Sequence, residues 1–323
     1  MTSVNIVIPD DDPPYYESAE HPRLRRLEAY GKVIYHGTRF ADRAEFFRRI
    51  EAADVILNVR GYSRFDEEGL AAARRLKMIS IVGRGTDNVD LAAAKRHGVV
   101  VSNTPGTNHI TVVETALGLM LAVMRKIPIS DRRLREGIWR EERGPELYGR
   151  TLGILGLGII GARMAEVGRA LGMRVIAWSF THDPARAAAV GAELVERDEV
   201  FRLADVVSVH ILSTAETRGF VGRRELALMK PTAYLINTAR GAVVDADDLR
   251  GALLEGRIAG AGLDVHVPEP LPLEENRFAD LENVVITPHL GGSSWEAAER
   301  MRVMTVENAI AFLEGRPVNV VNP

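Results

Sequence analysis

Three separated polar residues carry the chemistry that this sequence can offer. Arg240 lies within NTARG, Glu269 within LDVHVPEP and His289 within TPHLGG. A guanidinium binds a carboxylate through two parallel hydrogen bonds. An imidazole exchanges a proton near neutral pH, and a neighbouring carboxylate favours its protonated form. Together with a bound dinucleotide, these groups could move a hydride to or from a 2-hydroxy acid.

A glycine-rich turn precedes these residues. Gly156, Gly158 and Gly161 lie where a predicted strand, 151–155, passes into a predicted helix, 160–171. In such a turn the first glycine permits the tight bend, the second lets the backbone approach a pyrophosphate, and the third allows close helix–strand packing. The start of the helix adds unpaired N–H groups and a partial positive charge. We predict dinucleotide binding here, with Ile159 and Ile160 among the cofactor-binding residues.

The end of the next predicted strand, 174–178, bears on which dinucleotide fits. About 20 residues after the first glycine, an NAD site normally has an Asp or Glu for the ribose hydroxyls, but here Ser179 holds that place. Ser179 does not repel a 2′-phosphate, and His182 and Arg186 could attract one. Ser179 could also hydrogen-bond an NAD ribose, as could Asp183. The cofactor is therefore NAD or NADP, and the residues favour acceptance of NADP.

Composition limits the class of protein. The 323 residues suffice for two domains, and 46% hydrophobic and 26% charged residues are typical of a soluble globular protein. A net charge of −3 implies no general nucleic-acid affinity, and the absence of cysteine excludes disulfides, thiolate catalysis and zinc–thiolate sites. Met1–Asp12 does not resemble a signal peptide, and no apolar stretch is long enough for a membrane span. We expect a cytoplasmic protein with no metal, membrane or nucleic-acid partner.

Short apolar runs alternate with helical patterns along the chain, which predicts an α/β fold with mostly parallel sheets and helices on both faces. A long helix is predicted over 111–124, with Pro128 beyond its end, and another over 295–314. A shorter helix is predicted over 23–30. The charged segment 132–142 is expected to be exposed and less regular. The predicted strands are 4–8, 32–35, 54–58, 78–82, 151–155, 174–178, 206–210, 234–237, 260–265 and 284–287.

Longer stretches of the chain resemble the D-2-hydroxyacid dehydrogenase family. The matching segments are 83–90 (GRGTDNVD), 103–120, 147–161, 229–245, 263–270, 287–292 and 315–323. The resemblance implies two Rossmann-like or flavodoxin-like domains, with parallel sheets flanked by helices and the active site in the interdomain cleft. It implies a substrate domain of residues 1–104 plus 292–323, and an inserted NAD(P)-binding domain of residues 105–291. It also implies a homodimer formed through the inserted domain.

The resemblance assigns roles to individual residues. Arg240 matches the arginine that holds the substrate carboxylate, His289 the acid/base, and Glu269 the carboxylate paired with that histidine. The nicotinamide supplies the hydride chemistry. Further matches on the cofactor side are His210, Thr238, Ala239, Asp264 and Gly291; Asp264 could instead have a structural role at a strand end. Leu212 stands where the family usually has proline.

The substrate side is expected in two loops that follow predicted strands of the first domain. Arg60 and Gly61 follow one strand, and Gly83, Arg84 and Gly85 follow another. By resemblance, their backbone N–H groups meet the substrate carboxylate. We hypothesise that Arg60, and less so Arg84, favours substrates with a second anionic group; both side chains could equally point to solvent.

The resulting prediction is an NAD(P)-dependent oxidoreductase that interconverts a small D-2-hydroxy acid and its 2-oxo acid. Glyoxylate, hydroxypyruvate, phenylpyruvate-like acids and 3-phosphoglycerate all fit these residues. The alternative is a dinucleotide-sensing binding protein like the family's corepressor relatives. A formate-oxidising relative fits less well, because the longer amino-terminal part of that branch is missing.

Overall fold

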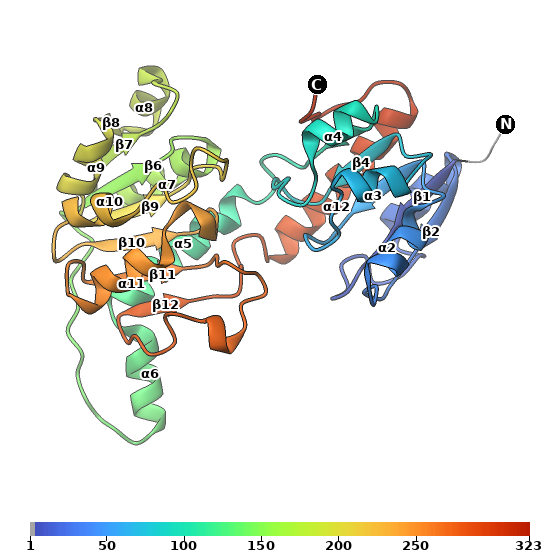
Figure 1. The fold of residues 1–323 in the computed structure, drawn as a ribbon. Coiled ribbons are helices and arrows are strands. Elements are labelled where there is room, and N and C mark those ends of the chain that lie inside the picture. Colours follow the sequence, from blue (N-terminus) through green and yellow to red (C-terminus); the bar gives the residue numbers. More distant parts are fainter. Residues whose placement is uncertain (1–3) are drawn as a thin grey trace. The chain divides into compact units, whose positions relative to one another are not determined.

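The computed structural model describes residues 4–323, so the first three residues of the segment compared with a signal peptide lie outside it. The chain forms two compact units (Figure 1). The first comprises the residues up to Asn108 together with Ser294–Pro323, and the second is His109–Ser293.

The first unit is built on a five-stranded parallel sheet in the order β2-β1-β3-β4-β5. Strands β1, β3 and β4 are largely buried apolar runs, as expected where helices cover both faces of a parallel sheet. Strand side chains alternate between two cores, so Val7 packs with α2, α3 and α4 while Ile6 and Ile8 pack with α1 and α12. The elements are β1 Asn5–Ile8, α1 Pro22–Arg25, η1 Arg26–Ala29, β2 Lys32–Tyr35, α2 Arg43–Ile50, β3 Val55–Asn58, α3 Glu67–Ala72, β4 Met78–Ile81, α4 Leu91–Arg96, β5 Val100–Ser102 and α12 Trp295–Leu313.

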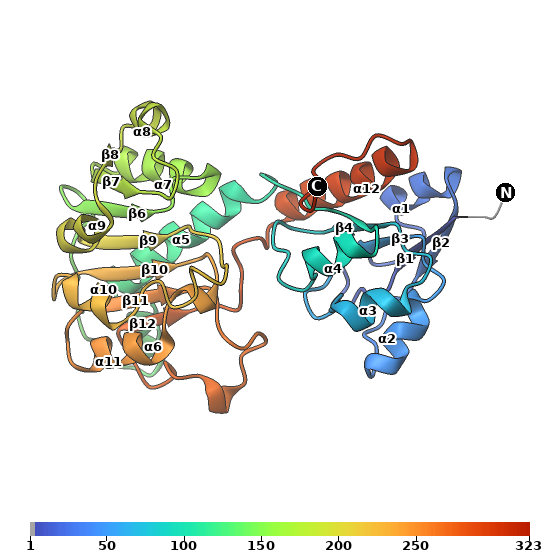
Figure 2. The same ribbon diagram turned by 45° about the horizontal axis from the view of Figure 1, so that its top comes forward.

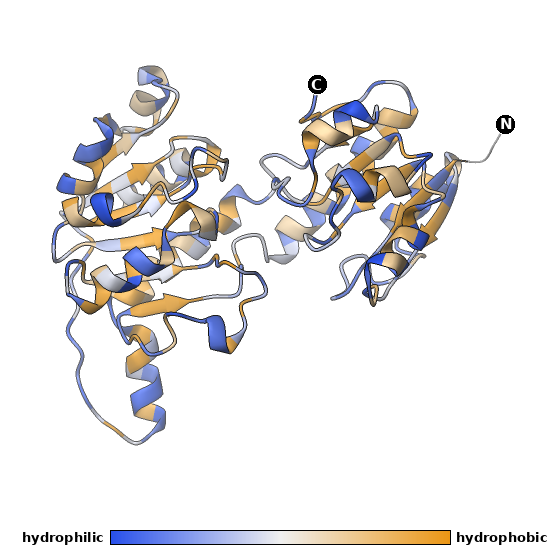
Figure 3. Ribbon diagram, viewed as in Figure 1, coloured by the Kyte–Doolittle hydropathy of each residue, from blue (hydrophilic) through white to orange (hydrophobic). Residues whose placement is uncertain are grey.

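The second unit carries a seven-stranded parallel sheet in the order β12-β11-β10-β9-β6-β7-β8. Helices α5, α7 and α8 cover one face, and α9, α10 and α11 cover the other (Figure 2). Figure 3 shows most strands of both sheets as hydrophobic, whereas hydrophilic and hydrophobic residues alternate along the helices. The elements are α5 His109–Met124, α6 Ile127–Arg135, β6 Thr151–Leu155, α7 Ile159–Ala170, β7 Arg174–Trp178, α8 Pro184–Val190, β8 Glu193–Leu194, α9 Arg197–Leu203, β9 Val206–Val209, α10 Arg223–Leu228, β10 Tyr234–Asn237, η2 Gly241–Val243, α11 Ala246–Leu254, β11 Gly260–Leu263, η3 Leu273–Glu275 and β12 Val284–Ile286.

The order of this sheet locates a binding edge. The chain moves outward from β6 through β7 to β8, then crosses back to β9 on the other side of β6. In doubly wound sheets, ligands bind beyond the carboxyl ends of the strands at such a reversal. The predicted glycine turn follows β6, and the segments with Arg240, Glu269 and His289 follow β10, β11 and β12. All four therefore lie at one edge of the sheet.

Two local expectations were wrong. Residues 132–135 belong to α6 rather than to an irregular segment, whereas 136–142 is irregular as predicted; Pro128 lies beyond the end of α5, as predicted, and in the first turn of α6. Proline fits the first turn of a helix because the N–H that it lacks would have no helical partner there. The predicted helix over 23–30 is instead the short α1 followed by the 3-10 turn η1. No helix within residues 4–323 is long and apolar enough to cross a membrane.

Candidate active site

His289 and Glu269 form a hydrogen-bonded pair in the second unit. His289 Nδ1 lies 2.7 Å from Glu269 Oε2, and the other carboxylate oxygen accepts the backbone N–H of His266 at 2.8 Å. Burial raises the pKa of Glu269, but the hydrogen bonds from His289 and from the His266 N–H outweigh it, and the net pKa lies below the ordinary value. Glu269 is therefore an anion at neutral pH and can stabilise a protonated His289.

The loop that carries His289 is fixed by Asp264. This carboxylate is fully buried. Its Oδ1 accepts the Thr287 hydroxyl at 2.5 Å and the Leu290 N–H at 2.7 Å, and its Oδ2 accepts the Gly291 N–H at 2.8 Å. The backbone carbonyl of Asp264 accepts the His289 N–H at 2.8 Å.

These contacts explain an unusual backbone conformation. His289 has a φ of 58°, in the left-handed region that non-glycine residues seldom adopt. A strained residue of this kind persists only where its surroundings fix it, and the bonds to Asp264 do so. Asp264 and Gly291, predicted to contact the cofactor, are thus joined to each other and to the histidine loop.

Arg240 begins a turn that packs against the Glu269 loop. Asn237 closes this turn, because its side chain donates to the Arg240 carbonyl at 3.0 Å and accepts the Ala239 N–H at 3.0 Å. Arg240 Nη1 donates to the Ala239 carbonyl at 2.8 Å. A Cβ on Gly241 would lie 2.4 Å from the His266 carbonyl oxygen, so only glycine permits this approach. The Arg240 turn and the His266–Glu269 segment are therefore in direct contact.

In the glycine turn, a Cβ at Gly156 or Gly161 would clash with neighbouring atoms, whereas a Cβ at Gly158 would not. Gly156 has a φ of 96°, and a Cβ on Gly161 would lie 2.0 Å from the Gly156 carbonyl oxygen. Gly158 is the N-cap of α7 without a capping side chain, and a Cβ there would meet no atom within 4 Å. The first N–H groups of α7, at Ile159 and Ile160, thus begin beside open space. This arrangement fits a pyrophosphate at the helix terminus.

Two residues that directly follow the neighbouring strands β10 and β9 also fit a dinucleotide. The Thr238 hydroxyl is buried and has no hydrogen-bond partner among residues 4–323. Leaving a buried donor unpaired is unfavourable, so a bound ligand could complete this site. His210 Nε2 lies 2.8 Å from the Ser208 hydroxyl, and burial lowers the pKa of His210 to about 4. His210 is therefore neutral at neutral pH.

Ser179 follows β7, and its surroundings bear on the choice of dinucleotide. Asp183 caps α8 by accepting the Arg186 N–H at 2.9 Å, and its other oxygen lies 3.5 Å from Arg186 Nε. Arg186 Nη1 donates to the Leu157 carbonyl in the glycine turn at 3.2 Å. Arg186 is therefore brought to the predicted cofactor site, whereas Asp183 is engaged in its own helix. His182 is exposed.

The predicted substrate-binding residues lie at the carboxyl edge of the five-stranded sheet in the first unit. Arg60 and Gly61 follow β3, and Gly83, Arg84 and Gly85 follow the adjacent β4. Within residues 4–323 Arg60 forms no ion pair, and its buried Nε has no hydrogen-bond partner. Its guanidinium carbon lies 5.8 Å from the centre of the Tyr15 ring. Gly83 has a φ of 98°, and its N–H donates to Thr104 Oγ1 at 2.8 Å.

Sequence reasoning missed His266. Its backbone meets both Glu269 and Gly241, and its ring Nε2 lies 2.9 Å from the Thr287 carbonyl oxygen. Nothing in the spacing of the sequence separated it from an ordinary loop histidine, because its partner lies 21 residues further along the chain.

Known proteins match this architecture. Residues 117–291 match the family model described as "D-isomer specific 2-hydroxyacid dehydrogenase, NAD binding domain". The chain is 42% identical over 310 residues to a glyoxylate reductase of Thermococcus litoralis, covering 93% of each chain. It is 39% identical over 283 residues to a D-3-phosphoglycerate dehydrogenase of Archaeoglobus fulgidus, covering 87% of this chain and 53% of that protein.

A solved structure extends the likeness. An acyclic imino acid reductase, in complex with NADPH and D-Arg, superposes with a TM-score of 0.88 at 29% identity, covering 98% of this chain and all of that one. The chain belongs to the D-isomer specific 2-hydroxyacid dehydrogenase family. It spans about half the length of the curated relatives named D-3-phosphoglycerate dehydrogenase, and most of that of the glyoxylate reductase. The family and the solved complex support NAD or NADP as cofactor.

Proposed function

We propose that this chain is an NAD(P)-dependent D-2-hydroxyacid dehydrogenase that interconverts a small 2-hydroxy acid and its 2-oxo acid. The observation that carries the proposal is the His289–Glu269 pair at 2.7 Å, packed beside the Arg240 turn through Gly241 and His266. This arrangement supplies the His289 imidazole to exchange a proton, the Glu269 carboxylate to stabilise the protonated imidazole, and the Arg240 guanidinium to bind a substrate carboxylate.

The three proposed catalytic residues have separate roles in the reaction. The bond at Nδ1 of His289 leaves Nε2 to take the hydroxyl proton of the 2-hydroxy acid, and to return it in the opposite direction. Glu269 stabilises the imidazolium that this transfer creates. Arg240 binds the substrate carboxylate and so orients the carbon that reacts. When bound, the nicotinamide accepts or donates the hydride.

The cofactor would be held along the carboxyl edge of the seven-stranded sheet. Gly156, Gly158 and Gly161, with the first N–H groups of α7, would hold the pyrophosphate. His210, Thr238, Ala239, Asp264 and Gly291 would line the remainder of the site. Ser179 replaces the usual acidic residue and Arg186 lies close by, so we propose that NADP is accepted at least as well as NAD.

On the substrate side we propose Arg60, Gly61, Gly83, Arg84 and Gly85. Arg60 has a charge that no described carboxylate neutralises, which supports its preference for a substrate with a second anionic group. An Arg60→Ala variant whose relative rates on phosphorylated and plain substrates are unchanged from those of wild type would eliminate this idea. We also propose a cytoplasmic location, as expected from the sequence of a globular protein.

A turnover assay tests the main proposal. The purified protein is mixed with NADH or NADPH and a panel of 2-oxo acids, and absorbance of the reduced nicotinamide is followed. We expect oxidation with at least one acid, with a rate for NADPH at least equal to that for NADH. Binding of the dinucleotide without turnover on any acid would instead support the alternative, a dinucleotide-sensing binding protein.

The assigned acid/base gives a second, sharper test. His289→Ala removes the group that moves the proton, and general acid–base catalysis typically contributes about 10²–10⁴-fold. We expect kcat to fall by that order while the dissociation constant of the dinucleotide stays close to the wild-type value. Near-wild-type turnover in this variant would refute the role of His289.

A further inference from the structure

His266 lies where three segments of the proposed site meet. Its backbone N–H donates to Glu269 Oε1 at 2.8 Å. Its own backbone is the surface against which Gly241, and hence the Arg240 turn, packs. Its ring Nε2 lies 2.9 Å from the carbonyl oxygen of Thr287, two residues before His289. One residue thus contacts the segments of all three proposed catalytic side chains.

Only the last of these contacts depends on the identity of the side chain. A carbonyl oxygen accepts but does not donate, so Nε2 of His266 carries the hydrogen. A neutral ring with hydrogen at Nε2 and a protonated ring both make this bond, so the contact does not require a charge change. Any residue except proline could supply the backbone contacts at position 266, but the bond to Thr287 requires a side-chain donor of suitable length.

Thr287 is itself a fixed point of the histidine loop. Its hydroxyl donates to Asp264 at 2.5 Å, and its N–H donates to the Leu263 carbonyl at 2.9 Å. The His266 ring adds the bond at its carbonyl, so the residue that leads into the strained His289 is held at three atoms. His266 thus contacts the His289 loop through its ring and Glu269 through its backbone N–H. The segments of both His289 and Glu269 are therefore held by the same residue.

We propose that His266 is a positioning residue, which holds the Glu269 segment and the His289 loop in register through its bond to Thr287. This inference rests on the proposed function. The His266 ring need not touch the substrate or the cofactor for this role. Its effect is on the geometry of the His289–Glu269 pair, and small displacements of catalytic groups are costly to the rate.

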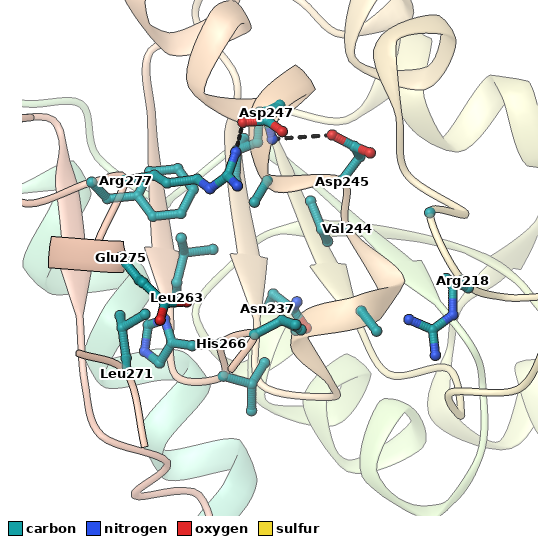
Figure 4. A pocket seen from close by; sticks show the side chains of 18 residues that line it. Arg218, Asn237, Val244, Asp245, Asp247, Leu263, His266, Leu271, Glu275 and Arg277 are labelled. Carbon is teal, nitrogen blue, oxygen red and sulfur yellow. Dashed lines mark hydrogen bonds and ion pairs between the residues drawn. The ribbon is translucent and has the colours of Figure 1, made fainter. Parts of the chain in front are cut away.

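A cavity next to His266 makes the substitution test feasible. The ring lines a pocket of about 320 Å³ together with Leu271, Val244 and Phe278 (Figure 4). A phenylalanine ring at position 266 therefore has space beside it. The charged residues that line the same cavity are Arg218, Asp245, Asp247, Glu275 and Arg277.

Three variants separate positioning from packing. His266→Phe keeps a ring but removes the donor, His266→Gln keeps an amide donor, and Leu271→Ala alters the cavity without touching a hydrogen bond. We expect His266→Phe to lower kcat by about tenfold, as expected for a displaced catalytic group, with little change in KM for the dinucleotide. It should also shift the pH profile of kcat, because the His289–Glu269 contact is loosened. His266→Gln should recover most of the rate, and Leu271→Ala should behave as wild type.

Amide hydrogen exchange of the cofactor-free protein gives a readout that does not need activity. We expect faster exchange over 287–291 in His266→Phe than in wild type, and recovery in His266→Gln. Unchanged exchange and kcat in His266→Phe, or an equal loss in Leu271→Ala, would overturn the inference. A wild-type protein without turnover would refute the proposed function instead, and the exchange comparison would still decide whether His266 holds the loop.

Discussion

Glu269 shows how a half-exposed carboxylate can be kept charged beside a histidine. Its side chain is 35% exposed and that of His289 is 43% exposed, so burial alone does not define the site. The decisive contacts are directional, one from the His289 ring and one from the His266 N–H. Both favour the anion, and an anion in this position supports a protonated imidazole.

The lowered pKa of Glu269 makes a prediction about stability. A carboxyl group with a folded-state pKa below its unfolded value stabilises the fold fully above the unfolded pKa, and this contribution is lost as the pH falls through the folded value. Glu269→Gln cannot ionise. We therefore expect the difference in Tm between wild type and variant to shrink as the pH is lowered from about 6 to about 3.

Thermal unfolding of both proteins across this pH range checks the prediction. Glu275→Gln is a matched control further along the same connection, where the carboxylate forms no hydrogen bond or ion pair within residues 4–323. A Tm difference for Glu269→Gln that stays constant, or grows, as the pH falls would contradict the assignment of these hydrogen bonds.

At the level of elements, the turn between β6 and α7 separates a folding requirement from a binding requirement. A Cβ on Gly161 would collide with the backbone of Gly156, which cannot move aside without distorting the turn. A Cβ on Gly158 would enter open space, and its φ of −80° suits alanine. The fold therefore requires a glycine at position 161, whereas at position 158 it leaves space for a side chain or a ligand.

This difference predicts opposite phenotypes for two identical substitutions. We expect Gly161→Ala to destabilise the protein by about 1–3 kcal/mol, the usual cost of overpacking. Gly158→Ala should cost less than about 1 kcal/mol at this N-cap position, but should weaken dinucleotide binding, because its methyl group occupies the approach to the pyrophosphate. Denaturant unfolding and calorimetric titration with NADH and NADPH measure the two effects. Tight binding by a stable Gly158→Ala variant would remove the turn from the proposed cofactor site.

The elements were predictable from sequence to different degrees, for physical reasons. Strands such as 151–155 and 174–178 are short apolar runs with clear ends, and the structure has both as predicted. Helix α6 was missed because its second half is charged and none of its residues is buried, so the segment lacks the long apolar face of a core helix. The bonds from Asp264 to its loop, and from His266 to Thr287, were also beyond reach, since local patterns carry no information on partners more than 20 residues away.

For the whole molecule, the alternation of strands and helices predicted parallel sheets but not the order of their strands. The orders β2-β1-β3-β4-β5 and β12-β11-β10-β9-β6-β7-β8 agree with the flavodoxin-like and Rossmann-like domains that the family resemblance implied. The roles of Arg240, Glu269 and His289 came from the same resemblance and stay predictions, although the structure brings their segments together.

The surface of the second unit carries an apolar region that its own fold leaves uncovered. Helix α6 has no buried residue, and Leu134 and Ile138 on and after it are exposed, as is Trp139, at 91%. Figure 1 shows that a long connection joins α6 to the remainder of the unit. Exposed apolar residues gathered in this way are typical of an interface. The family resemblance implies a homodimer through this domain, so we propose that a second copy of the chain covers them.

Sedimentation velocity tests the state of assembly. We expect wild type to sediment as a particle of about twice the 35.5 kDa chain mass, and the double variant Leu134→Glu/Trp139→Glu to sediment as a monomer, because buried unpaired charges oppose association. Trp295→Glu is the matched control, since Trp295 is similarly exposed, at 85%, but lies in the first unit. It should leave the dimer intact. A monomeric wild type at micromolar concentration, or equal dissociation in both variants, would show that α6 and Trp139 do not form the interface.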